Sequence, residues 1–92
     1  MSRLSGSPVV TSAVDPASML DGNEEAFEVT VPGAKLGDFA FVSYSIDVAD
    51  LELSAQVTAA NTVTVSLSNN TGGTIDLGAG TLRVKTVPFD HL

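Results

Sequence analysis

The segment from Leu51 to Leu67 alternates apolar and polar residues in two runs, and this pattern constrains the fold more than any other feature of the chain. Apolar residues at every second position share one face of an extended strand, and the Ser, Thr, Gln and Glu residues between them share the other. Ala60-Asn61 separates the two runs and offers a turn. The pattern predicts a β-hairpin with one dry and one polar face. Its predicted dry face comprises Leu51, Leu53, Ala55, Val57, Val63, Val65 and Leu67.

Further strands are predicted on both sides of this hairpin, at 9–14, 26–31, 39–46, 74–77 and 81–87. Turn residues lie between them at Pro32-Gly33, at Asn69–Gly73 and at Gly78–Gly80. Asp15–Gly22 offers either a helical turn, with Asp15 as its N-cap, or a tight loop. Every connection is too short for the helix of a parallel crossover. The prediction is therefore an all-β fold, a small antiparallel β-sandwich or barrel of six to seven short strands.

The length of 92 residues predicts one domain. We expect a flexible N-terminal arm at 1–8, a single β domain at 9–87 and a C-terminal tail at 88–92. A chain this short buries only roughly 60% of the surface that its unfolded form exposes, so the core is thin. The chain has no Cys, and disulfides therefore cannot compensate. Self-association can, and we expect an oligomer, with a homotrimer as the specific prediction.

The formal net charge of −7 argues against nucleic acid and anionic membranes as partners, since both attract Lys and Arg. The four cations, Arg3, Lys35, Arg83 and Lys85, are interpreted as solvated positions on strands and loops. The first residues lack the apolar core of a signal peptide, and no apolar run approaches the ~20 residues of a membrane span. We therefore expect synthesis and use in an aqueous compartment.

No group of residues predicts catalysis, a cofactor or a tightly bound metal. His91 is the only imidazole and lies in the tail, where an orienting neighbour is rare. Asp21, Asn23 and Glu25 match the opening of a calcium loop but lack its later Gly and Glu, so the 21–25 loop is interpreted as solvated, with a weak calcium site as the alternative. Asn69-Asn70-Thr71 matches the glycosylation sequon and is interpreted as a chance match in a turn.

The predicted strand at 39–46 begins apolar on both faces, with Phe39 and Phe41 on one and Ala40 and Val42 on the other. Such a strand is either central in a sandwich, covered on both sides, or part of an interface with another chain. The sequence leaves both interpretations open. The residues that we select as candidate contacts with another copy or a partner are Arg3, Leu4, Phe39, Phe41, Phe89 and Leu92.

Between Asp15 and Val84 the chain resembles small β-rich structural proteins of tailed bacteriophages, including head decoration (cement) proteins and fibre-associated modules. The most specific part is A-A-N-T-V-T-V at 59–65, followed by N-x-T-G-G-T-I-D-L at 69–77. The remaining stretches are Asp15-Pro16 with Asp21-Gly22, Gly37-Asp38-Phe39 with Val42-Ser43, Leu51 with Leu53-Ser54-Ala55, and Gly80-Thr81-Leu82-Arg83-Val84.

The resemblance implies a virion component and not an enzyme. Decoration proteins of this kind commonly sit as trimers on the capsid surface, so the implied partners are the major capsid protein and other copies of the chain. Synthesis would take place in the host cytoplasm. The expected function is therefore that of a capsid decoration protein that stabilises the capsid lattice. The alternatives are a tail-fibre-associated module that binds a host-surface ligand and, from another class, a small enzyme.

Overall fold

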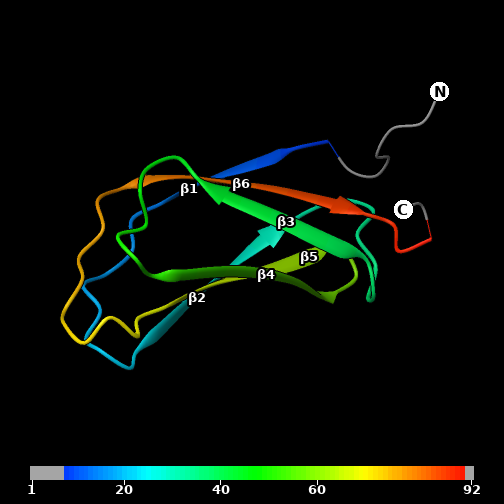
Figure 1. Cartoon of the computed structure of the whole chain (residues 1–92). Coiled ribbons are helices and arrows are strands. Elements are labelled where there is room, and N and C mark those ends of the chain that lie inside the picture. The colour runs from blue at the N-terminus through cyan, green and yellow to red at the C-terminus, as the bar shows by residue number, and fades with distance from the viewer. Residues whose placement is uncertain (1–7, 91–92) are drawn as a thin grey trace.

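The computed structural model describes residues 8–90 and shows six antiparallel strands in two three-stranded sheets, packed as a sandwich (Figure 1). The predicted all-β class is confirmed, with a sandwich and not a barrel. The strands are β1 (Val10–Val14), β2 (Glu24–Thr30), β3 (Phe39–Tyr44), β4 (Glu52–Ala59), β5 (Thr62–Ser68) and β6 (Gly80–Val87).

The strand order is β1-β6-β3 in one sheet and β2-β5-β4 in the other. Among the described strands, only β4 and β5 are consecutive in the chain and paired, so every other connection crosses between the two layers. At one side of the sandwich β3 lies beside β4, although the two belong to different sheets (Figure 1). The central strands are β5 and β6, and each is hydrogen-bonded to a neighbouring strand along both edges.

The predicted hairpin is confirmed in its register. Leu53 lies opposite Leu67, Ala55 opposite Val65 and Val57 opposite Val63, with an irregularity between Val57 and Ala59 just before the turn. The dry face therefore points into the sandwich, since residues directly opposite in an antiparallel pair share a face.

Asn61 makes the turn of this hairpin possible, because it adopts a left-handed conformation with φ of 63° that Asn tolerates better than most residues. Its backbone N–H donates to the Ala34 carbonyl at 2.8 Å, and its carbonyl accepts from the Val31 N–H at 2.9 Å. Its side-chain Oδ1 accepts from the Gly33 N–H at 2.7 Å. The turn is thereby joined to the loop that follows β2.

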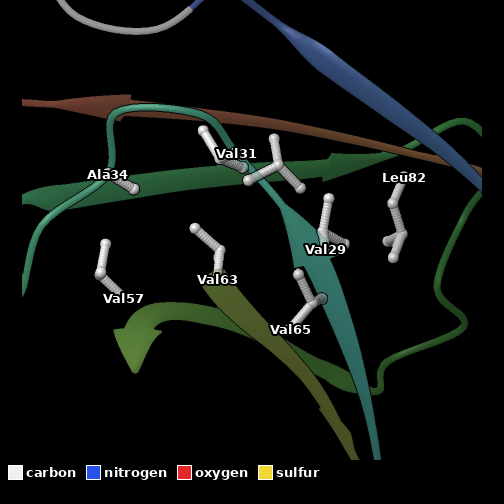
Figure 2. Packing of buried hydrophobic residues seen from close by; sticks show 8 residues of the cluster. Val29, Val31, Ala34, Val57, Val63, Val65 and Leu82 are labelled. Carbon is white, nitrogen blue, oxygen red and sulfur yellow. The ribbon is translucent and has the colours of Figure 1, made fainter. Parts of the chain in front are cut away.

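The core consists of two groups of buried side chains between the sheets. The larger group includes Val63 and Val65 from β5 and Leu82 and Val84 from β6, and Figure 2 shows its side chains meeting between the layers. The smaller group lies toward the end of the sandwich where β1 ends, and it comprises Met19, Leu51, Leu67 and Leu77. Leu53 is only half-buried and packs against both groups, so its contribution is smaller than the alternation alone suggests.

The strand predicted at 74–77 is wrong, since 74–77 form no full strand. Of the two alternatives for 15–22, the helical turn is wrong, and the segment is a loop with a turn at 21–22. The two segments instead meet in an isolated bridge, in which the Met19 N–H donates to the Ile75 carbonyl at 2.7 Å and the Ile75 N–H donates back at 2.9 Å. Met19 is buried in the core at this end, and the bridge to Ile75 pairs its backbone groups as in a strand.

Asn69 holds the same end of the molecule together. Its side chain is fully buried, and its Nδ2 donates to the Met19 and Gly73 carbonyls at 2.9 Å each. Its Oδ1 accepts from the backbone N–H and the hydroxyl of Thr71, at 3.0 and 2.8 Å. The sequon at this position is therefore structural, since the amide that a glycan would need is buried and bonded to the protein.

Tyr44 packs against both core groups from the inner face of β3, and its hydroxyl donates to the Gly78 carbonyl at 2.9 Å. The ring lies so close to Gly80 that a Cβ there would be 2.8 Å from Tyr44 Cζ. Glycine at the start of β6 therefore makes room for the only tyrosine of the chain. Burial raises the pKa of the Tyr44 hydroxyl above its ordinary value, and the negative charge of Asp15 raises it further.

We expect the stability of the protein to fall at alkaline pH because of Tyr44. Above pH ~10 the tyrosine of the unfolded chain ionises while the folded one still holds its proton, so the unfolded state binds fewer protons and is favoured. The contribution is fully present below that pH and is lost as pH rises through the folded pKa. The chain contains one Tyr and no Trp, so a near-ultraviolet absorbance titration reports this group directly. A titration midpoint equal to that of the chain in denaturant would contradict the prediction.

Candidate functional site

The outer face of the β1-β6-β3 sheet carries exposed aromatic side chains. Phe39 and Phe41 on β3 are 43% and 47% exposed, and Phe89, just beyond β6, is 60% exposed. Arg83 and Lys85 point outward from β6 beside them. We call the surface made by these five residues the aromatic face.

Strand alternation places Phe39 and Phe41 on this face. Residues two apart in a strand point the same way, so burial of Ala40 and Val42 against the core turns both phenylalanines outward. The register sets Phe41 opposite Lys85 and Ser43 opposite Arg83. Aromatic and cationic side chains are thereby neighbours on adjacent strands.

Phe89 joins the face through the loop that precedes β3. The ideal Cβ position at Gly37 lies 3.8 Å from Cδ2 of Phe89, so the ring rests against this loop. Gly37 has a φ of 93°, a left-handed conformation that favours glycine. Val87, which lies opposite Phe39, is fully buried at this end of the sheet. The three phenylalanines are therefore held by β3, its preceding loop and the end of β6.

The interpretation of β3 as a central strand is wrong. β3 is an edge strand in the order β1-β6-β3, and its outward face remains exposed. A sandwich has polar residues on its outer faces as a rule, so two large aromatics at adjacent outward positions need a reason. The remaining interpretation, that this strand belongs to an interface, is the one that the exposure favours.

The outer face of the other sheet has the opposite character. It carries Glu24, Glu28 and Glu52, and most of its other outward positions are Ser, Thr or Gln. Ser68 donates to Oε2 of Glu24 at 3.2 Å, and the hydroxyls of Thr58 and Thr64 share a hydrogen bond of 2.8 Å. We call this surface the acidic face; none of its outward strand positions holds a cation or an aromatic residue.

The acidic loop at 21–25 uses its side chains to brace neighbouring segments. Oδ1 of Asp21 accepts from the Gly72 N–H at 3.0 Å, and Oε1 of Glu25 accepts from the Ala17 N–H at 3.0 Å. Within residues 8–90, no group of three or more His, Asp or Glu side chains is close enough to hold a metal ion. The loop therefore has a structural use that the D-x-N-x-E spacing did not predict.

Three of the six candidate contact residues lie together in the structure. Phe39, Phe41 and Phe89 form the aromatic face, whereas Arg3, Leu4 and Leu92 lie outside the described residues, as does His91. Arg83 and Lys85 were interpreted as solvated strand positions and were missed as part of this group. Alternation with Leu82 and Val84 showed that they point outward, but only the pairing of β6 with β3 brings them beside phenylalanine.

Comparison with models of known protein families, with curated proteins and with solved structures gives no match. The described part of the chain contains no helix long and apolar enough to cross a membrane. The fold and the two contrasting faces are therefore the features from which a function can be inferred.

Proposed function

We propose that this chain is a bacteriophage virion structural protein, a capsid decoration protein that binds the major capsid protein lattice and stabilises it. The observation that supports this most is the exposed pair Phe39 and Phe41 on an edge strand of a small rigid sandwich. Contiguous exposed apolar groups on a soluble domain mark an interaction surface. The resemblance of the 59–77 region to phage decoration and fibre-associated modules supports the virion as the place of that interaction.

A binding role also agrees with how the polar groups are used. The side chains of Asn61, Asn69, Asp21 and Glu25 all bond to backbone groups of neighbouring loops. These bonds fix the loops at both ends of the sandwich, and a rigid scaffold loses little entropy when it binds. We therefore propose a preformed module that docks without large rearrangement.

We propose in addition that the protein assembles as a homotrimer on the capsid. The core of so short a chain is thin, and copies arranged around a symmetry axis would bind a lattice junction at several points at once. Light scattering or analytical ultracentrifugation at tens of micromolar tests self-association of the free protein. A clean monomer would limit the trimer to the capsid-bound state, and cryo-electron microscopy of decorated heads would then give the number of copies at each site.

The direct test of function uses phage from which the gene encoding this chain has been deleted. Purified protein is mixed with heads of the deletion phage, and the heads are pelleted. We expect saturable binding at a fixed ratio to the major capsid protein and a higher temperature of head disruption. Absence of binding to heads, with the protein instead found in purified tails of wild-type virions, would favour the tail-fibre-associated alternative.

A further inference from the structure

We infer that the aromatic face is the surface that docks on the capsid, and that its partner is a protein surface with carboxylates placed around exposed apolar groups. This inference rests on the proposed function and deepens it by assigning the face and the chemistry of the partner. It follows from the location of the aromatic side chains and from an unequal distribution of charge over the two sheets.

The aromatic residues supply the apolar part of the contact. Phe39, Phe41 and Phe89 are each at least 43% exposed, so each has apolar surface left to bury. Aromatic residues are enriched at the centres of protein interfaces, where they account for much of the binding energy. Phe41 lies between Phe39 and the polar half of β3, and across the strand it faces Lys85. It is therefore the residue at which the apolar and cationic parts of the face meet.

The charges indicate the character of the partner. In a chain with a net charge of −7, two of the four cationic residues, Arg83 and Lys85, lie on one face of one strand. No carboxylate occupies an outward position of β1, β6 or β3. Apart from the buried Val87, these outward positions are held by Thr11, Ala13, Phe39, Phe41, Ser43, Thr81, Arg83 and Lys85. The strands of this face thus carry two cations and no carboxylate, and Asp90, the residue after Phe89, is the acidic group next to it in the chain. Charge complementarity therefore favours a partner with carboxylates opposite Arg83.

A second copy of the chain fits this face poorly. Two aromatic faces brought together around a two-fold axis would set Arg83 and Lys85 of one copy near those of the other, and like charges in an interface are costly. The acidic face of another copy has the complementary charge. However, the two faces lie on opposite sides of the sandwich (Figure 1), so their contact would build an open stack and not a closed ring.

An anionic lipid surface would also attract phenylalanines beside cations. The rest of the described surface disfavours it, because the acidic loop at 21–25 and the acidic face place many carboxylates on the same small domain. The capsid protein is therefore the partner that we propose, and lipid binding is an outcome to be tested.

The test compares two variants of the aromatic face, each with a matched control elsewhere. Phe41→Ser removes an exposed aromatic, and its control Leu20→Ser removes an apolar side chain that is 62% exposed in the loop between β1 and β2. The double variant R83Q/K85Q is matched by S54E/Q56E on the acidic face, since each pair lowers the formal net charge of −7 by two. Circular dichroism and thermal melting show that all four are folded, and Arg83→Gln alone replaces the double variant if that pair melts early.

Each protein is titrated onto heads of the deletion phage, and bound protein is measured after pelleting. We expect Phe41→Ser and R83Q/K85Q to weaken binding by at least about tenfold, whereas both controls stay within about threefold of wild type. Binding of the wild type should weaken as salt rises from about 0.05 to 0.5 M, and this salt dependence should be smaller for R83Q/K85Q.

The outcomes separate the inference from the proposed function. If the wild type binds heads and both face variants bind equally well, the decoration role stands and the assignment of the face is wrong. If the wild type fails to bind heads, the proposed function fails and the inference fails with it. Stacks of free protein that R83Q/K85Q abolishes would replace the capsid by a second copy as the occupant. Wild-type pelleting with vesicles of phosphatidylserine and phosphatidylcholine, lost in Phe41→Ser, would replace it by lipid.

Discussion

Replacing Asn69 with alanine is expected to lower the free energy of unfolding by about 2–4 kcal/mol. The substitution removes four hydrogen bonds, two donated by Nδ2 and two accepted by Oδ1. The Met19 carbonyl keeps the bond from the Ile75 N–H but loses its second donor, and the Thr71 N–H loses its acceptor. Polar groups left without a partner cost more than the net gain of an ordinary hydrogen bond. Urea denaturation followed by far-ultraviolet circular dichroism measures the change.

The matched control is Asn70→Ala, because Asn70 is the exposed neighbour in the same loop. Its effect should stay within about 0.5 kcal/mol, as for most surface substitutions. Asn69→Asp keeps an acceptor for Thr71 but loses the two donors, so it should also be destabilising. Equal stabilities of Asn69→Ala and Asn70→Ala would show that the hydrogen bonds of the Asn69 side chain do not hold the 15–23 and 69–75 segments together.

Truncating Leu67 to alanine is expected to cost about 2–5 kcal/mol, the largest single-residue effect that we predict. Leu67 has no exposed surface, lies on the central strand β5 and packs against Met19, Leu51 and Leu77. Because β5 is paired on both edges, its backbone is less free to move inward and close the cavity. For a domain of about this size, such a loss lowers the melting temperature by roughly 10 °C or more.

Two further variants are expected to lose less stability than Leu67→Ala and serve as comparisons. Ser66→Ala, one residue away on the outer face of β5, should be nearly neutral because it removes no core volume. Leu53→Ala should lie between the two, since Leu53 is directly opposite Leu67 but only half-buried. A loss for Ser66→Ala as large as that for Leu67→Ala would contradict the assignment of the inner and outer faces of β5.

Where local pattern and tertiary packing agree, the sequence was a sufficient guide. The β4–β5 hairpin is the clearest example: its alternation, its turn at Asn61 and its register were all predictable from neighbouring residues. A hairpin needs only contacts between residues that are close in the chain. The one-residue precision of its register follows because a slip would turn Val63, Val65 and Leu67 toward water.

The structure of the segments at 15–22 and 74–77 could not be predicted from local sequence. Asp15 and Pro16 favour a helical start, but the energy of placing Met19 in the core, with bonds to Ile75 and Asn69, outweighs this weak local preference. The partners are about fifty residues apart in the chain, and no local signal connects them. In the same way, Ile75 has the apolar character of a strand residue but forms only a bridge, because it pairs with a loop.

By itself the sequence determined the β class, the outward direction of Arg83 and Lys85 and the apolar character of both faces of the 39–46 segment, since each of these depends only on alternation along one strand. The tertiary structure alone decided that β3 is an edge strand beside β6, and therefore that Phe39 and Phe41 stay exposed and lie next to the two cations. Strand order depends on all the buried contacts between strands that are distant in the chain, and many alternative strand pairings compete to form such contacts. The aromatic face is a product of that competition, so no single stretch of the sequence contains it.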